Sequence, residues 1–326
     1  MTADELIREN LDKFPDIPTM TLAKKLYKEH PAFFRGLENC RSMIRYRRGN
    51  VGNALRKSLK NKDHARDPGK AGWSIPKSIA KTQKPYKLTD GRWLILSDLH
   101  IPYHDEEAIE NALDYGFAIG CDHVLLNGDV CDFFALSRWI KNPEERNFSR
   151  ELQQTRHFLG YLRQLYPKGK IVYKLGNHEQ RLQDWLFTKA PEIVGCSEFE
   201  MRTLLEFNKW GVEEVESKRK IKAGQHMTII HGHEIFGGSA VNPARGLYMQ
   251  MGVCAMKGHN HRPSAHQEKN ADGKIMTCWS TGCLCHLEPD YAPVNKWGHG
   301  FATLDLEGNK FTVTNHSIID GQVNNI

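Results

Sequence analysis

Five short apolar runs in this chain each end in a cluster of Asp, Asn or His residues. The clearest run, residues 170–175, is rich in β-branched and aromatic side chains and is followed directly by Gly176. Such a run predicts a buried strand and a tight turn, and this turn carries Asn177, His178 and Glu179. Ligands of open α/β sheets bind at the carboxyl ends of strands, so we expect chemistry at this edge of the predicted sheet.

The other four runs share this pattern of an apolar strand followed by a polar cluster. Their clusters supply Asp98 and His100, Asp129, His231, and His259 with His261. Carboxylate, imidazole and amide ligands suit Mn²⁺, Fe or Zn²⁺, and the absence of thiolates from these clusters argues against a structural zinc site. One such cluster is most often only a turn, but packing does not explain five of them at strand ends. The sequence therefore predicts a metal centre.

The order of the predicted elements indicates an α/β fold. Strand-like runs at residues 93–97, 123–127 and 170–175 alternate with helical patterns at residues 106–119, 149–165 and 179–208. A hairpin pattern covers residues 218–230, and the segments 275–279 and 301–314 alternate like antiparallel strands. We expect two sheets packed face to face, with helices on the outside.

The basic charge of the chain is concentrated in its N-terminal part. The whole chain has a formal net charge of +6, yet residues 1–87 hold 20 Lys and Arg against 9 Asp and Glu. Residues 88–326 hold the remaining 25 against 30. A basic surplus of this kind points to a polyanionic partner for the N-terminal part, and we expect nucleic acid.

Three short helices are predicted before residue 50. Thr2 and Glu5 form a capping box for the first, the second begins near Thr21 and stops at Pro31, and the third covers residues 36–48. The third helix carries Arg41, Arg45, Arg47 and Arg48. The arrangement resembles a helix-turn-helix module, whose last helix lies in the DNA major groove, although a solvated basic helix explains the same pattern.

A basic segment containing proline separates these helices from the α/β part. Residues 51–59 predict a short basic helix, and Pro68, Pro76 and Pro85 interrupt an extended linker. The linker either binds a phosphate backbone non-specifically or is simply solvated. We therefore expect a helical domain at residues 1–60, a linker at residues 61–90 and the α/β domain at residues 91–326.

The cysteines and the apolar segments bear on the location of the chain. Its eight cysteines are scattered, unlike those of a small disulfide scaffold, so we expect reduced thiols and a cytoplasmic location. No apolar stretch approaches the roughly 20 residues of a membrane helix, and we expect no secretory signal and no membrane partner. Cys278, Cys283, Cys285 and His286 lack the paired Cys-x-x-Cys spacing of zinc sites, which favours a buried structural role.

Five motifs of the chain resemble, in order, those of the calcineurin-like metallophosphoesterases. They are Asp98-Leu99-His100, Gly128-Asp129-Val130-Cys131-Asp132, Gly176-Asn177-His178-Glu179, His231-Gly232-His233 and Gly258-His259-Asn260-His261. The resemblance covers about residues 92–283 and leaves out residues 1–87. It implies a four-layer α/β/β/α sandwich, here with a small all-α N-terminal domain. It also implies two divalent metal ions, in the first place Mn²⁺, with Fe, Zn²⁺ or Ni²⁺ as alternatives.

The resemblance also assigns roles to these residues. One ion would be held by Asp98, His100, Asp129 and His261, and Asp129 would bridge to a second ion held by Asn177, His231 and His259. A hydroxide bridging the two ions would attack phosphorus in line. His178 would protonate the leaving oxygen, and Asp132 would orient it through its other ring nitrogen.

The residues that contact the phosphate are less clearly specified. The Gly-Asn-His-Glu motif resembles that of the protein Ser/Thr phosphatases. Those enzymes, however, have Arg directly after the second Asp of their second motif, where this chain has Phe133. Candidates to replace that Arg are Arg138, Arg181 and Arg262. His104 and His233 lie near metal motifs and are candidates for lining the pocket or binding phosphate, although a structural role fits them equally.

Three functions fit this sequence. The first is a phosphodiesterase or nuclease acting on DNA or RNA, with the basic N-terminal part delivering the substrate. The second is a phosphomonoesterase acting on nucleotides or phosphoproteins, and the third is a DNA-binding regulator with a secondary metal site. A complete ligand set at all five motifs argues against the regulator, and the uneven charge favours nucleic acid over monoesters.

Overall fold

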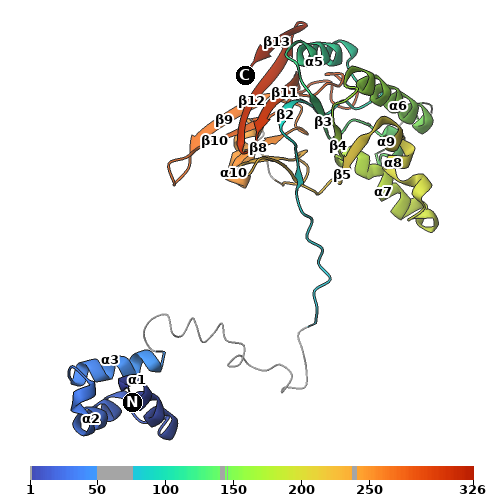
Figure 1. Cartoon of the computed structure of the whole chain (residues 1–326). Helices are drawn as coiled ribbons and strands as arrows, with labels where there is room; N and C mark the ends of the chain where they lie inside the picture. The colour runs from blue at the N-terminus through green and yellow to red at the C-terminus, as the bar shows by residue number, and fades with distance from the viewer. Residues whose placement is uncertain (1, 50–75, 140–143, 145, 237–240) are drawn as a thin grey trace. The chain divides into compact units, whose positions relative to one another are not determined.

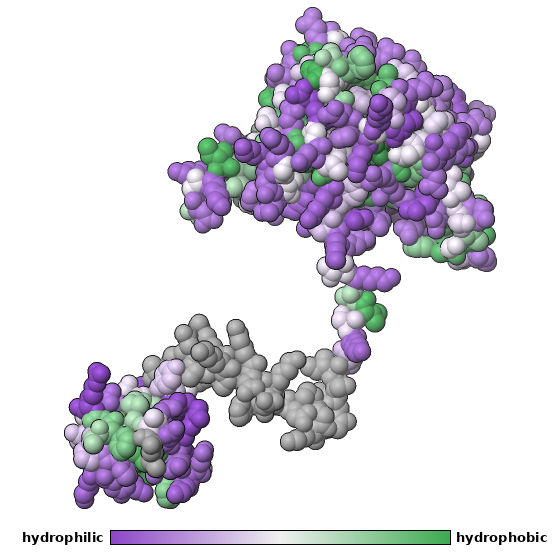
Figure 2. Space-filling model, in the orientation of Figure 1, coloured by the Kyte–Doolittle hydropathy of each residue, from purple (hydrophilic) through white to green (hydrophobic). Residues whose placement is uncertain are grey.

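The structure, a computed structural model, describes residues 2–49, 76–139, 144, 146–236 and 241–326. The chain divides into two compact units, Met1–Lys81 and Thr82–Ile326 (Figure 1). Figure 2 shows that the visible surface of both units is largely hydrophilic, with apolar residues in scattered patches. None of the described helices is both long and apolar enough to cross a membrane.

The N-terminal unit contains the three predicted helices. They are α1 (Ala3–Lys13), α2 (Thr19–Glu29) and α3 (Leu37–Arg47), with a 3-10 turn at Pro31–Phe33. The predicted capping box is present, because the Glu5 amide donates to Thr2 Oγ1 at 3.3 Å and the Thr2 amide donates to Glu5 Oε2 at 2.7 Å. A small apolar core holds the helices together and consists of Leu6, Ile7, Leu22, Ala23, Leu26, Phe34, Cys40 and Ile44.

The connection between the two units is described only in part. The basic helix predicted at residues 51–59 and most of the predicted linker lie outside the described residues. From residue 76 to residue 85 the chain forms neither helix nor strand. Strand β1 (Tyr86–Lys87) then pairs in parallel with β6 (Ile221–Ala223), so the chain joins a sheet earlier than the predicted boundary at residue 91.

The second unit contains two β-sheets. The seven-stranded sheet has the order β13-β12-β11-β2-β3-β4-β5, and the six-stranded sheet has the order β1-β6-β7-β8-β10-β9. Strands of the first sheet are β2 (Gly91–Leu96), β3 (His123–Asn127), β4 (Ile171–Lys174), β5 (Val212–Val215), β11 (His299–Glu307), β12 (Lys310–Ile319) and β13 (Gln322–Asn325). The second sheet adds β7 (Met227–Ile229), β8 (Cys254–Lys257), β9 (Ser264–Lys269) and β10 (Ile275–Ser280) to β1 and β6.

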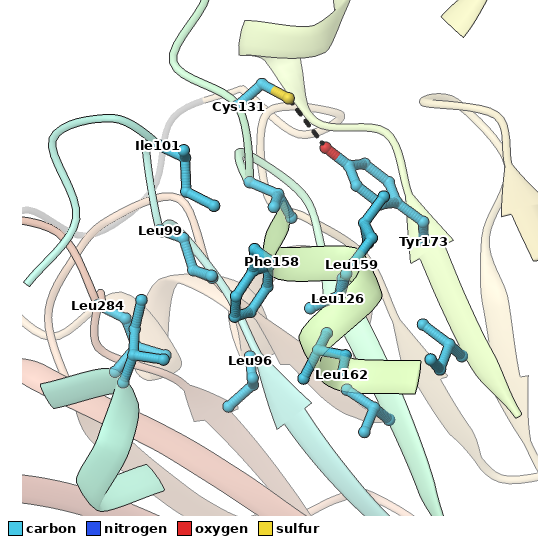
Figure 3. Close-up of a cluster of buried hydrophobic side chains, with 14 of the residues drawn as sticks. Leu96, Leu99, Ile101, Leu126, Cys131, Phe158, Leu159, Leu162, Tyr173 and Leu284 are labelled. Carbon is cyan, nitrogen blue, oxygen red and sulfur yellow. Dashed lines mark hydrogen bonds between the residues drawn. The ribbon is translucent and has the colours of Figure 1, made fainter. Parts of the chain in front are cut away.

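Two apolar cores define the layers. One core lies between the sheets and joins Trp93, Ile95 and Leu125 of the first sheet to Ile229 and Met256 of the second. The neighbouring residues Leu94 and Leu126 face the other way, as alternation along a strand requires. That face packs against α5 (Glu106–Ala118) and α6 (Phe148–Leu165), and Figure 3 shows Leu159 and Leu162 beside Leu126.

A helix on the far side of the second sheet completes the sandwich. Leu247 of α10 (Pro243–Met251) packs against Ala255 of β8 and Cys278 of β10. The layers are therefore helix, sheet, sheet, helix, which confirms the predicted fold class. Helix α10 and the strands β5, β9 and β13 were not among the predicted elements.

The helical region predicted at residues 179–208 is broken into short pieces. The structure has α7 (Asn177–Lys189), two 3-10 turns at Pro191–Ile193 and Ser197–Phe199, and the one-turn helices α8 (Met201–Leu204) and α9 (Phe207–Trp210). Pro191 cannot continue a helix, and Gly195 adopts a positive φ of 91°. The prediction of one helical region was wrong here because these two residues stop the α-helical hydrogen bonding.

Candidate metal centre

The five polar clusters meet because the strands that carry them are parallel neighbours. In the first sheet, β2, β3 and β4 run in parallel, so the residues that follow them lie at one edge. In the second sheet, β7 and β8 are also parallel neighbours, and they lead to His231 and His259. The two edges touch, because the His259 amide donates to both carboxylate oxygens of Asp98, at 2.9 and 3.1 Å.

Most of the predicted ligands have an unusual backbone conformation. A left-handed φ occurs at Asp98 (57°), His100 (51°), Asp129 (52°), His259 (67°) and His261 (53°). This conformation is uncommon outside glycine and persists only where the surrounding structure enforces it. Five of the predicted ligands therefore keep an unfavourable backbone conformation at the strand ends, where it sets the direction of their side chains.

Asp129 lies at the middle of the cluster. Its Oδ2 atom is 3.1 Å from His231 Nε2, 3.9 Å from His178 Nε2 and 4.0 Å from His100 Nε2. Asp98 lies beside it, with Oδ1 at 3.2 Å from His261 Nε2 and 3.9 Å from His231 Nε2. The carboxylates and imidazoles from both sheets thus converge on one buried volume.

These residues fit a pair of divalent cations. The ligand atoms of Asp98, His100 and Asp129 lie within 4.8 Å of one another, and so do those of Asp129, His231 and His259. The two groups share Asp129. Asn177 Oδ1 is buried without a hydrogen-bond partner, a costly arrangement that a cation would relieve. The donor set of carboxylates, imidazoles and one amide oxygen is that of Mn²⁺, Fe or Zn²⁺.

Buried charges compensate one another within the protein itself. Burial opposes ionisation of Asp129, but the imidazoles of His231 and His178 outweigh it and hold the pKa of Asp129 well below its usual range. Burial also disfavours a charged His231, yet Asp129 and Asp98 raise its pKa to about 10. Burial likewise disfavours a charged His261, but Asp98 outweighs it and raises the pKa of His261 to about 9. Cations compete with these protons, so metal binding releases them.

The carboxylate of Glu179 fixes the loop that carries Asp129. It accepts hydrogen bonds from the backbone amides of Asp129, Val130, Cys131 and Gly176 and from the hydroxyl of Tyr173. Gly176 permits this close approach, because a Cβ atom there would overlap the Asp129 carboxylate. Glu179 was part of the predicted turn, but its positioning role was not foreseen.

A buried ion pair fixes the loop that carries His231. The Lys174 side chain is 0% exposed, and its Nζ lies 2.9 Å from Glu234 Oε1 and donates to the Ser217 carbonyl at 2.7 Å. Glu234 accepts from the backbone amide of His231 at 3.2 Å and from that of Gly232 at 2.6 Å. Burial opposes ionisation of Glu234, but the Lys174 ammonium outweighs it and lowers the pKa of Glu234 to about 2.

This ion pair was missed from sequence, although a signal was present. Lys174 lies inside the run of residues 170–175 that was interpreted as a buried strand. A lysine at a buried strand position requires an acidic partner, but nothing in the sequence identifies that partner as Glu234.

His178, Asp132 and Arg181 form a second group beside the predicted ligands. His178 Nδ1 lies 3.0 Å from Asp132 Oδ1, and the same carboxylate oxygen lies 2.9 Å from His100 Nδ1. Arg181 donates to the Asp132 carbonyl at 2.8 Å, and its other terminal nitrogen lies 2.9 Å from His178 Nε2. A guanidinium can only donate, so in this contact His178 Nε2 accepts and the ring proton resides on Nδ1.

The remaining phosphate-binding candidates make other contacts. His233 Nε2 is 2.7 Å from Ser217 Oγ, and its ring lies 5.3 Å from that of His231. Arg138 is exposed and lies over the ring of Trp139, and Arg262 donates to the Val241 carbonyl at 3.0 Å. His104 lines a cavity of about 500 Å³ between α5 and α6. Of the predicted arginines, Arg181 is the one placed against His178.

The cysteine cluster divides into two environments. Cys278 is buried in the apolar contact between α10 and the second sheet. Cys285 Sγ instead lies 3.9 Å from His261 Nδ1 and forms a ligand group with His261 and His100. The Cys285 thiol therefore lies next to the candidate centre, which the structural role expected for the whole cluster does not account for. All eight cysteines are free thiols.

Three of the four predicted nucleic-acid-binding arginines of α3 and its C-cap contact other residues of the N-terminal unit. Arg47 pairs with Asp4 of α1, and Arg48 donates to Thr19 Oγ1 of α2 at 2.9 Å. Arg41 pairs with Glu38 at 3.2 Å on the same helix, and Arg45 is exposed. Arg47 and Arg48 thus hold α3 against the other two helices.

Comparison with known proteins agrees with this fold and centre. The family model described as calcineurin-like phosphoesterase matches residues 91–263, just over half of the chain. The gene 54 protein of Mycobacterium phage L5 is 30% identical over 234 residues, which cover 67% of this chain and 89% of that protein. The gene 54 protein of Mycobacterium phage D29 is 28% identical over 235 residues, with coverage of 67% and 90%.

Two solved structures are similar at lower identity. Vacuolar protein sorting 29 from Cryptosporidium parvum is 18% identical with a TM-score of 0.40, covering 73% of this chain and 96% of that one. The YfcE phosphoesterase from E. coli is 14% identical with a TM-score of 0.36, covering 72% and 98%. With the family match, the fold and the ligand groups define a metal-dependent phosphoesterase. The chain belongs to the calcineurin-like phosphoesterase family.

We predict that the Lys174–Glu234 ion pair both stabilises the fold and strengthens metal binding. Lys174→Met leaves the Glu234 carboxylate buried without its counter-charge, which costs about 3 kcal/mol of unfolding free energy. Because Glu234 holds the His231 amide, we also expect Mn²⁺ binding to weaken about tenfold. Urea unfolding and calorimetric titration with Mn²⁺ measure the two effects.

Lys170→Met provides the matched control. Lys170 pairs with Glu213 at 3.4 Å on the surface, where such a pair contributes about 0–1 kcal/mol. Equal losses in the two variants, or unchanged Mn²⁺ affinity in Lys174→Met, would contradict the positioning role of the buried pair.

Proposed function

We propose that this chain is a dinuclear-metal-dependent phosphodiesterase that hydrolyses DNA or RNA. The observation that carries the proposal is the pair of buried ligand groups that share Asp129. One cation would be held by Asp98, His100, Asp129 and His261, and the other by Asp129, Asn177, His231 and His259. When bound, two cations neutralise charge on the phosphate and lower the pKa of the attacking water, and Mn²⁺ is the ion we expect.

The chain's own residues orient the substrate and move a proton. His178 would protonate the oxygen that leaves phosphorus, and Asp132 would hold the ring through Nδ1. Arg181 contacts His178 Nε2, the atom that must carry the transferred proton. A phosphate oxygen is a stronger partner for a guanidinium than a neutral imidazole, so binding of the substrate would draw Arg181 away and leave Nε2 free to take up a proton from solvent. Burial opposes the charged ring, but Asp129 outweighs it and raises the pKa of His178, so the ring would hold this proton until it passes to the leaving oxygen.

The nucleic-acid part of the proposal is supported by the charge distribution. Residues 1–87 carry all of the basic surplus, and the small three-helix unit presents Arg45 on the exposed side of α3. We propose that this unit binds nucleic acid in the manner of a helix-turn-helix module and delivers it to the centre. The free thiols fit a reducing compartment, so we place the enzyme in the cytoplasm.

A phosphomonoesterase acting on nucleotides or phosphoproteins is the second candidate. The Gly-Asn-His-Glu motif favours it, whereas Phe133 is fully buried and leaves the position of the expected arginine without a phosphate contact. Arg181 supplies a guanidinium from α7 instead. The DNA-binding regulator is disfavoured, because it gives no reason for seven ligands to converge.

We predict that the full chain with Mn²⁺ hydrolyses bis-p-nitrophenyl phosphate and oligonucleotides, and that Asp129→Asn abolishes both activities. Asn removes the negative charge that both ligand groups share. Release of p-nitrophenol and denaturing electrophoresis are the measurements. Full activity of Asp129→Asn would exclude the shared-carboxylate mechanism, and activity on phosphomonoesters alone would favour the second candidate.

His178→Ala tests the proton donor. An alkoxide leaving group needs a proton, whereas p-nitrophenolate leaves readily without one. We expect kcat to fall by about 10²–10⁴-fold for a phosphodiester with an alkyl leaving group and much less for bis-p-nitrophenyl phosphate. Equal losses for both substrates would remove His178 from the role of acid.

Removal of residues 1–81 tests the delivery role. The second unit has its own apolar cores, so we expect it to retain hydrolysis of bis-p-nitrophenyl phosphate. Binding of oligonucleotides should weaken and lose part of its salt dependence, because phosphate contacts are lost. Arg45→Glu in the full chain should weaken binding in the same direction. Unaltered binding in both proteins, measured by fluorescence anisotropy, would refute the delivery role.

A further inference from the structure

Aromatic side chains surround the candidate centre on two sides. Tyr103 follows His100 closely in sequence and packs edge-on against Phe134, with ring centroids 5.9 Å apart. On the other side, Trp297 packs against the predicted ligand His261, with centroids 4.2 Å apart. Tyr291 packs against Trp297 at 6.1 Å. None of these contacts is needed to hold a metal ion.

The loop between β10 and β11 is held firmly in place. Asn295 donates from its side chain to the carbonyls of Leu287 and Ala292, at 2.6 and 2.8 Å, and accepts from the Trp297 amide at 2.8 Å. The end of the loop is tied to the centre, because the Gly298 amide donates to the His261 carbonyl at 2.8 Å.

The same loop is also tied to the segment that follows His100. The His286 amide donates to the Tyr103 carbonyl at 2.9 Å. The loop therefore connects the two aromatic pairs. Its aromatic residues are presented by a defined backbone that is bonded to both sides of the centre.

Tyr291 is an exposed residue of this loop. The residue is 73% exposed, which is unusual for so large an aromatic side chain in a fixed loop. Tyr291 therefore offers an exposed aromatic side chain beside Trp297, which itself contacts the predicted ligand His261.

We propose that Tyr291 and Trp297 form a stacking platform for a nucleobase next to the phosphate that is hydrolysed, so that the enzyme selects single-stranded nucleic acid. The proposal rests on the phosphodiesterase function above and adds the form of its substrate. A base in a duplex is already stacked between its neighbours, whereas an unpaired base offers its π-face to an aromatic side chain. Stacking of this kind contributes about 1–3 kcal/mol per base.

Two small phosphodiesters with the same leaving group test the platform. Thymidine 5′-(p-nitrophenyl phosphate) carries a base, and ethyl p-nitrophenyl phosphate does not. With the full chain and Mn²⁺, we expect kcat/KM to be about tenfold higher for the thymidine ester, which corresponds to about 1.4 kcal/mol of stacking. The difference should lie mainly in KM, because stacking acts equally on the bound substrate and the transition state.

Substitutions at the platform should remove this preference. Tyr291→Ala and Trp297→Ala should each bring the ratio of the two kcat/KM values closer to one, whereas Tyr291→Phe keeps the ring and should keep the ratio. Tyr291 is mostly exposed, so its variants are expected to fold, and thermal melting checks this. Phe117→Ala, at a 70% exposed aromatic on α5, is the matched control.

Each outcome bears on one level of the proposal. Equal kcat/KM values for the two diesters in the wild-type protein would overturn the platform and leave the phosphodiesterase function intact. Hydrolysis of p-nitrophenyl phosphate but of neither diester would instead overturn the proposed function. Wild-type cleavage of a single-stranded oligonucleotide faster than its duplex would support the platform. Equal cleavage of the two would contradict it.

Discussion

The second unit is organised around a carboxylate that is almost completely buried. Asp129 follows β3 of the first sheet, and the imidazole of His231, which follows β7 of the second sheet, lies 3.1 Å from it. A buried negative charge must be compensated, and here the compensation comes from histidines on both sheets. The face-to-face packing of the sheets therefore adds the imidazole of His231 to that of His178, which follows β4 of the first sheet.

Polar side chains behind the centre hold its loops in their strained conformations. Glu179 accepts hydrogen bonds from successive amides around Asp129, and Glu234, paired with Lys174, does the same for the His231 loop. Glu179 is buried and the Glu234 side chain is only 12% exposed, so water competes little for these hydrogen bonds. We infer that this support allows several ligands to keep a left-handed backbone that would otherwise relax.

The parts of this molecule that sequence predicted well are those set by local pattern. The strand ends were predictable because an apolar run followed by Gly and polar residues is a local signal, and parallel pairing then brings them together. The breaks at Pro191 and Gly195 were overlooked although both residues are visible in sequence. Contacts such as Lys174 with Glu234, or Cys285 with His261, join distant segments, and only the fold identifies these partners.

Crystals grown with Mn²⁺ and measured near the manganese absorption edge test the central claim most directly. Two anomalous peaks on either side of the Asp129 carboxylate are predicted, one next to Asp98 and His100 and the other next to His231 and His259. A single peak, or peaks that do not share Asp129, would contradict a dinuclear centre built from both sheets.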